Sequence, residues 1–110
     1  MDKFAALADP TRRKIMELLA GDGQLPAAEI AAHFSISAPA ISQHLKVLQE
    51  ARLVSVEKKA QQRIYRINPQ AMLELEDWAR QVRQHWNRRF DDLEMVLEEE
   101  LRKEQQDERE

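Results

Sequence analysis

Apolar residues recur three and four positions apart through the first half of the chain, which is the period of an amphipathic helix. The pattern predicts a short helix at the N-terminus, a second helix that Asp9 caps and Pro10 opens, and a third that starts near residue 26. A fourth helix is predicted over 37–51, with Ser37 as its cap and Pro39 in its first turn. Four helices therefore come before any strand.

The spacing of apolar residues changes beyond residue 52. Segments 53–57 and 63–67 are rich in β-branched and aromatic residues, as strands are, and the polar, basic segment 58–62 joins them. We therefore predict a β-hairpin. Since the tip contains no glycine, we expect it to differ from the two-residue turns with positive φ that commonly close hairpins.

The last helix opens at Asn68 and Pro69, again a capping residue followed by proline. Its apolar residues make seven steps over 26 residues, about 3.7 per turn, at Leu75, Ala79, Val82, Trp86, Phe90, Leu93, Leu97 and Leu101. A left-handed coiled coil needs about 3.5, so we expect a nearly straight helix. No apolar residue follows Leu101, and we expect one domain over 1–101 and an acidic tail over 102–110 that frays.

This apolar stripe is longer than so small a domain can cover. Large side chains such as Trp78, Trp86 and Phe90 are costly to leave in water. Two interpretations are open. Either the helix folds back over its own core, or a second copy of the chain covers the stripe. In the second case the protein is a homodimer, with the N-terminal helix packed beside the last one.

Composition and charge exclude several classes of protein. The chain has no cysteine, which excludes disulfides, thiolate metal sites and thiol switches. No apolar run is long enough to span a membrane, and the N-terminus lacks the pattern of a secretory signal, so we expect a cytoplasmic protein. The net charge is −3, but residues 1–66 carry +3 and residues 67–110 carry −6. The N-terminal part is therefore basic although the whole chain is acidic.

Residues 27–48 read as a helix, a three-residue turn and a second helix with a shared core, which is the pattern of a helix-turn-helix. On the second of these helices the apolar residues fall on one face, and Ser42, Gln43 and Lys46 fall on the opposite face. Glutamine can pair with adenine through two hydrogen bonds, serine can donate or accept, and lysine can neutralise a phosphate. The pattern predicts a recognition helix that enters the major groove of DNA. A generic core is the alternative for an amphipathic helix pair taken alone.

The basic hairpin that follows strengthens the DNA-binding interpretation. Lys58, Lys59 and Arg63 suit a wing that lies along the DNA backbone or in the minor groove. The predicted fold is therefore mainly α with a small β-hairpin. It is a winged helix-turn-helix in the order α-α-α-α-β-β-α, with a long C-terminal dimerisation helix.

Several short motifs occur together in the order and spacing of one known family. They are L-A-D-P-T-R-R at 7–13, A-P-A-I-S-Q-H-L-K-V-L at 38–48, L-V at 53–54 and R-I-Y-R-I at 63–67. On these residues the chain resembles the ArsR/SmtB family of winged helix-turn-helix transcription regulators. The motif W-x-x-R-F-D-x-L at 86–93 resembles a subgroup of that family without the cysteine sensor.

The resemblance implies a homodimeric repressor that binds an inverted-repeat operator through the recognition helix (37–51) and the wing (53–67). It assigns base reading to the three polar residues of that helix and places Ala38 and Pro39 near the groove. It puts the dimer interface on the first and last helices, which here maps to Phe4, Leu7, Leu75, Trp78, Val82, Trp86, Phe90, Leu93 and Leu97.

The chain departs from the family pattern at three positions. Arg52 stands where the family has a glycine, at a helix end that favours positive φ. Ser35 replaces a turn glycine, and the wing tip lacks its usual glycine as well. We therefore expect backbone strain at Arg52.

Relatives of this family often sense metals, so the possible ligands matter. The helix before the recognition helix has no cysteine, and the last helix has one histidine, His85, with Asp77 and Gln81 before it as partners in a weak site at most. We predict no metal site and no cofactor. A metal-responsive repressor of the same fold is one alternative, and a winged-helix protein-interaction module that does not bind DNA is another.

His44 lies at the edge of the apolar face of the recognition helix. We expect its ring to pack and to hydrogen-bond a neighbour, because no nucleophile, base or acid accompanies it. Arg12 lies in the first turn of its helix, where the helix dipole disfavours a cation, so we expect it to be held by a structural partner. The sequence does not predict an enzyme.

Overall fold

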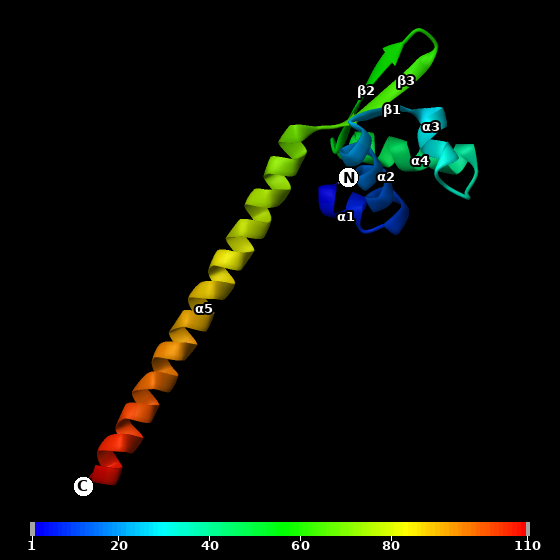
Figure 1. The fold of residues 1–110 in the computed structure, drawn as a ribbon. Coiled ribbons are helices and arrows are strands. Elements are labelled where there is room, and N and C mark those ends of the chain that lie inside the picture. The colour runs from blue at the N-terminus through cyan, green and yellow to red at the C-terminus, as the bar shows by residue number, and fades with distance from the viewer. Residues whose placement is uncertain (1, 110) are drawn as a thin grey trace. The chain divides into compact units, whose positions relative to one another are not determined.

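The computed structural model describes residues 2–109, which divide into two compact units at Leu73 and Glu74. Figure 1 shows the elements in chain order: α1 (Lys3–Leu7), α2 (Pro10–Asp22), β1 (Gln24–Pro26), α3 (Ala27–Ala32), α4 (Ala38–Glu50), β2 (Val54–Lys59), β3 (Gln62–Ile67) and α5 (Pro69–Arg109). The strands form one antiparallel sheet in the order β1-β3-β2. A mostly helical fold with a small sheet and a long C-terminal helix confirms the predicted class.

Capping side chains start α2 and α4 where the sequence predicts. The Asp9 carboxylate accepts from the backbone N–H groups of Thr11 at 2.8 Å and Arg12 at 3.2 Å. The Ser37 hydroxyl accepts from the N–H of Ala40 at 3.2 Å. These bonds satisfy amide groups that the first turn of a helix leaves without a helical partner.

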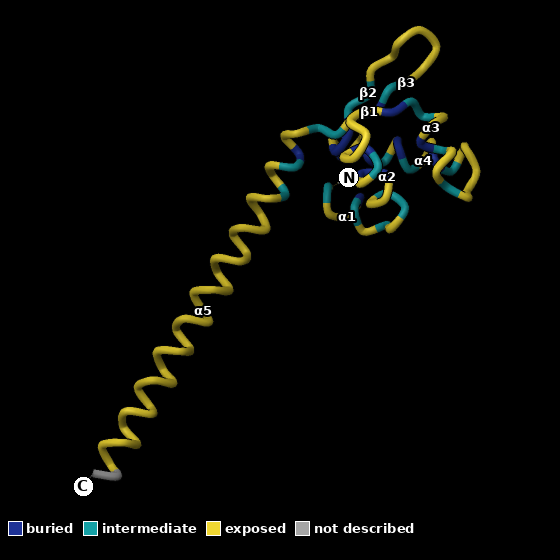
Figure 2. Tube along the Cα trace, in the orientation of Figure 1, coloured by how far each residue is buried: buried dark blue, intermediate teal, exposed yellow. Residues whose placement is uncertain are grey.

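The core of the first unit is apolar and joins the helices to the sheet. Figure 2 shows its buried segments on α2, α4 and the strands. The largest fully buried side chains are Ile15, Leu19, Ile30, Ile41, Leu45, Leu48 and Leu53. Since α4 buries three of these seven, its opposite face is left for solvent.

The strand β1 was not predicted from the sequence. It pairs with β3 so that Gln24, Leu25 and Pro26 lie opposite Arg66, Tyr65 and Ile64. Three residues are too few to show an alternating pattern, and the proline is tolerated because β1 is an edge strand. The corrected order is therefore α-α-β-α-α-β-β-α.

The expectation for the hairpin tip was wrong. Lys59 pairs with Gln62, so the loop contains only Ala60 and Gln61, and Ala60 has a φ of 54°. The tip is thus a two-residue turn with positive φ at its first position, without glycine. An L-residue in this region costs about 1–2 kcal/mol, which the strand pairing must offset.

The expected positive φ at Arg52 is confirmed, with a value of 61°. The N–H of Arg52 donates to the carbonyl of Gln49, and the N–H of Leu53 donates to the carbonyl of Leu48, both at 3.0 Å. This is a Schellman ending, in which Leu48 and Leu53 also supply the usual apolar contact, since both are fully buried. The ending turns the chain from α4 into β2.

The second unit is the remainder of α5, which runs straight in Figure 1. The helix continues to Arg109, beyond the end predicted at Leu101, since glutamate, glutamine, lysine and arginine are good helix formers. That residues 102–110 fray in solution stays a prediction, and residue 110 lies outside the described residues.

The apolar stripe of α5 is exposed in the single chain. Leu75 is half-buried, and the exposed fraction lies between 49% and 68% for Val82, Trp86, Phe90, Leu93, Leu97 and Leu101. Trp78 is 51% exposed, and on α1 Phe4 is 48% exposed and Leu7 half-buried.

Candidate nucleic-acid interface

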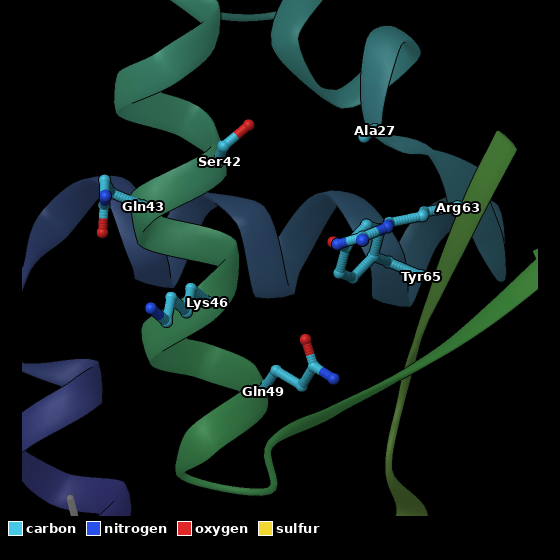
Figure 3. Close-up of a pocket in the computed structure, with 7 residues that line it drawn as sticks. All are labelled: Ala27, Ser42, Gln43, Lys46, Gln49, Arg63 and Tyr65. Atoms are coloured by element: carbon cyan, nitrogen blue, oxygen red, sulfur yellow. The ribbon is translucent and has the colours of Figure 1, made fainter.

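An open groove runs between α4 and β3 in the first unit (Figure 3). It is lined by Ala27, Ser42, Gln43, Lys46, Gln49, Arg63 and Tyr65. In Figure 3 Ser42 and Gln49 extend from α4 on the side of β3, whereas Gln43 and Lys46 project from the other side of the helix. The lining contains two cations, several hydrogen-bonding groups and no carboxylate.

The groove brings together the three polar residues predicted to read DNA, Ser42, Gln43 and Lys46, together with Arg63 of the wing. All four side chains are exposed. Ala38 and Pro39 are also exposed, in the first turn of α4, but they do not line the groove. The polar face lies outside because the apolar face of α4 is buried.

The register of the hairpin separates the basic residues of the wing. Lys58 lies opposite Arg63, and Lys59 lies opposite Gln62. Directly opposed residues share a face of the sheet, and Lys58 and Arg63 therefore extend the face that carries buried Val54 and Tyr65. Lys59 is on the other face.

Two cations directly opposite each other are unfavourable in the free protein, by about 0.2–1 kcal/mol. Lys58 and Arg63 are such a pair, and Arg63 lines the groove. An anion bound there would remove the repulsion.

Three groove residues were missed by the sequence reasoning. Gln49 lies seven residues, about two turns, after Ser42, so helical spacing alone places it on the side of α4 that carries Ser42. Tyr65 follows Arg63 by two and therefore shares its face of the strand. Ala27, at the start of α3, carried no signal in the sequence.

Arg12 holds His44 at the edge of the buried face of α4. Nε of Arg12 donates to the carbonyl of Ala6 at 2.6 Å, and Nη2 donates to the carbonyl of Ala5 at 3.5 Å. Nη1 lies 3.2 Å from Nδ1 of the His44 ring. His44 thus packs and hydrogen-bonds as expected, and Arg12 has the structural partners that the sequence suggested.

Asp9, beside this contact, is an acidic group with a shifted pKa. Its partial burial raises the pKa, but the backbone N–H groups of Arg12 and Thr11, with the nearby side chains of His44 and Arg12, more than compensate. The net result is a pKa below the ordinary value of 3.8, so the carboxylate form that caps α2 is favoured.

Among the residues that the structure describes, no three histidine, aspartate or glutamate side chains come close enough to hold a metal ion. Asp77, a suggested member of a weak site, instead accepts from the Gln81 amide at 3.0 Å and lies 4.0 Å from Arg80. Within the same described part, no helix is both long and apolar enough to cross a membrane.

Comparison with known proteins gives a family match that includes the α4 side of the groove. The profile of the bacterial regulatory proteins of the arsR family matches residues 9–56, which run from the cap of α2 into β2. The transcriptional repressor SdpR of Bacillus subtilis is 44% identical over 75 residues, which are 68% of this chain and 82% of that protein.

Solved structures share the fold. A possible transcriptional regulator for arsenical resistance superposes with a TM-score of 0.69 at 40% identity, over 74% of this chain and 84% of the other. An ArsR-like transcriptional regulator from Rhodococcus sp. RHA1 gives a TM-score of 0.72 at 29% identity, over 84% of this chain and 87% of the other.

Proposed function

This chain belongs to the ArsR family of bacterial regulatory proteins and is a DNA-binding transcription regulator, and we propose that it is a homodimeric repressor that reads an inverted-repeat operator. The recognition helix is α4, and the wing is the β2–β3 hairpin. The groove between α4 and β3 carries this proposal, because it combines exposed cations with groups that can read base edges.

Four groove residues and Lys58 of the wing have roles that follow from their chemistry. The Gln43 amide suits the paired donor and acceptor of adenine, and the Ser42 hydroxyl can donate or accept. Lys46 and, from the wing, Arg63 and Lys58 neutralise phosphates. Phosphate contacts set the register of the protein on the duplex, and the polar side chains then select the sequence.

The apolar stripe of α5 supports the homodimer. Its members repeat every eleven residues, since Leu75, Trp86 and Leu97 form one row, Ala79, Phe90 and Leu101 a second, and Val82 and Leu93 a third. Eleven residues in three turns give 3.67 per turn, slightly more than the 3.6 of a straight helix, so two such helices pair with a slight right-handed supercoil. A second copy would remove this exposed surface from water, at about 25 cal/mol for each Å² of apolar area buried.

The charges of α5 support an antiparallel pair. Residues 78–90 contain four arginines and no acidic residue, whereas residues 91–100 contain six acidic residues and no basic one. Antiparallel pairing about the boundary between Phe90 and Asp91 sets the basic segment of each copy against the acidic segment of the other. Parallel pairing would set like charges together. We infer the antiparallel arrangement for the dimer.

Selection of duplexes from a random pool by the full chain tests the proposal. We expect an enriched pseudo-palindrome whose half-sites are centred one helical turn apart, about 34 Å. Gln43→Ala should weaken binding by about 1–3 kcal/mol and relax one base position, whereas Lys46→Ala should weaken binding to all sequences alike. Gln24→Ala, an exposed glutamine on β1 outside the groove, is the matched control and should bind as wild type does.

Two results would contradict the proposal. If no sequence is enriched, the protein is not sequence-specific. If affinity for duplex DNA does not fall with salt, few phosphates are contacted and a protein-interaction module fits better.

A further inference from the structure

One guanidinium connects three helices of the first unit. Arg12 belongs to α2, its Nε and Nη2 donate to the carbonyls of Ala6 and Ala5 in α1, and its Nη1 meets Nδ1 of His44 in α4. These contacts link the recognition helix to the N-terminal helix through a single side chain.

The contact also fixes the chemistry of the imidazole. A guanidinium has five donors and no acceptor, so Nδ1 of His44 must accept the hydrogen bond. In the form of the ring that makes this bond, the ring proton is therefore on Nε2. His44 is half-buried and does not line the groove.

The remaining packing of α4 is largely apolar. Ile41, Leu45 and Leu48 are at most 1% exposed, but apolar contacts are non-directional and fix the rotation of a helix about its axis less sharply than a hydrogen bond does. Among the hydrogen bonds of residues 2–109, the bond of His44 is the one that joins a side chain of α4 to another helix.

We propose that Arg12 and His44 are positioning residues that set the rotation of α4 relative to α1, and thereby the base specificity of Gln43 and Ser42, which neither of them touches. With side chains, a helix has a radius of about 5–6 Å, so a rotation of about 10° moves a side-chain tip by about 1 Å. Binding constellations must hold within about 0.5 Å. Loss of the contact therefore impairs base reading while the phosphate contacts persist.

This inference rests on the proposed function and adds a link to the dimer. The carbonyls that Arg12 holds belong to α1, whose Phe4 and Leu7 are assigned to the dimer contact. Arg12 thus fixes the position of each recognition helix relative to α1, the helix that would contact the partner copy. The two helices of a dimer must keep a separation of about one DNA turn to bind both half-sites.

Two variants of His44 separate the hydrogen bond from the shape of the ring. His44→Phe keeps a planar ring and removes the acceptor. His44→Asn removes the ring but keeps an acceptor oxygen on Cγ, the atom that bears Nδ1. The affinity of each full-length variant is measured for the duplex selected by wild type and for a scrambled duplex, and its thermal unfolding confirms that it is folded.

We expect His44→Phe to lower the ratio of specific to scrambled affinity about tenfold, which is the discrimination that one bidentate base contact supplies. Its affinity for the scrambled duplex and its salt slope should stay unchanged, and His44→Asn should keep most of the ratio. Arg12→Lys should behave as His44→Phe does, because an ammonium cannot serve three acceptors in one plane. The double variant with Arg12→Lys and His44→Phe should lose no more of the affinity ratio than either single variant does.

A nitrogen-15 spectrum of the wild-type imidazole gives a readout that does not depend on DNA. We expect Nδ1 to carry no proton, as its acceptor role requires, and Nε2 to carry the ring proton. A proton on Nδ1 overturns the inference, as does an unchanged affinity ratio in His44→Phe or an equal loss in both His44 variants. If wild type selects no duplex, both the proposed function and this inference are wrong. If wild type and His44→Phe select the same duplex with the same affinity ratio, only the inference is wrong.

Discussion

Asn68 joins the end of the recognition helix to the start of the last helix through the carbonyl of Arg52. Its Nδ2 donates to that carbonyl at 2.8 Å, and its Oδ1 accepts from the N–H of Gln70 at 3.2 Å. A backbone bond from Asn68 to the carbonyl of Leu53 at 3.0 Å completes the joint. One asparagine thus bonds to the end of α4 and to the start of α5.

Substitution of Asn68 should destabilise the protein in two steps. Asn68→Asp keeps the acceptor for Gln70 but loses the donor to Arg52, and we expect it to cost about 1 kcal/mol. Asn68→Ala loses both bonds and should cost about 2 kcal/mol. Urea unfolding at one protein concentration measures both, and equal losses would mean that only one of the two bonds matters.

Arg52→Gly should stabilise the protein. The φ of 61° puts an arginine where glycine has no steric cost, so we expect a gain of about 1 kcal/mol in the free energy of unfolding. Arg52→Ala is the control, since it removes the side chain but keeps the strain. A gain in Arg52→Ala as large as that in Arg52→Gly would assign the effect to the side chain.

The cap of α2 should lose strength in acid. The pKa of Asp9 is lowered in the folded protein, so its contribution to stability is complete above the unfolded value of 3.8 and is lost as pH falls through the folded pKa. Asn is as good a cap as Asp but does not titrate. The difference in the free energy of unfolding between wild type and Asp9→Asn should therefore become smaller as the pH falls from 6 to 3. Urea unfolding across that range tests this, and parallel curves would argue against it.

Lys58→Glu should change stability and DNA binding in opposite directions. It replaces the repulsion with Arg63 by attraction, so we expect the free protein to gain about 0.5 kcal/mol. Binding to the selected duplex should weaken, with a salt slope reduced by about 1 or more. Lys59→Glu is the matched control, because Lys59 faces the other side of the hairpin and should affect binding less. Equal effects of both changes on binding would show that the face does not matter.

The direction of the α5 pair can be tested by charge reversal. Arg89 and Asp92 lie at equal distances from the boundary between Phe90 and Asp91. An antiparallel dimer therefore contains two pairs in which Arg89 of one copy lies beside Asp92 of the other. Arg89→Glu or Asp92→Arg alone should raise the dimer dissociation constant about fivefold, from two pairs at about 0.5 kcal/mol each. Sedimentation equilibrium should show recovery in the double variant. A parallel dimer would show no recovery.

The recognition helix was predictable because several local signals agree on it. Ser37 caps it, Pro39 fits its first turn, and Ile41 and Leu45 define its buried face. The strand β1 was not predictable, because pairing with β3 rather than its own pattern makes it a strand.

Other features depended on distant parts of the chain. Arg12 and His44 are 32 residues apart, and the sequence predicted a structural partner for Arg12 and packing for His44 without indicating that the two contact each other. The sheet faces of Lys58 and Lys59 depend on the register of the hairpin, which the two-residue turn at Ala60 fixes. That turn was not predictable, because alanine disfavours the positive φ that Ala60 adopts.

The eleven-residue spacing of α5 makes its length adjustable in discrete steps. Removing eleven residues from within the stripe takes away almost three whole turns, so the apolar rows on either side of the cut meet again about 20° out of phase. Removing ten would rotate them by about 80° and turn the second row away from its neighbour. In the proposed dimer, shortening or duplication of α5 by whole repeats would therefore keep the apolar rows nearly in line and change the distance between the two DNA-binding units in such increments.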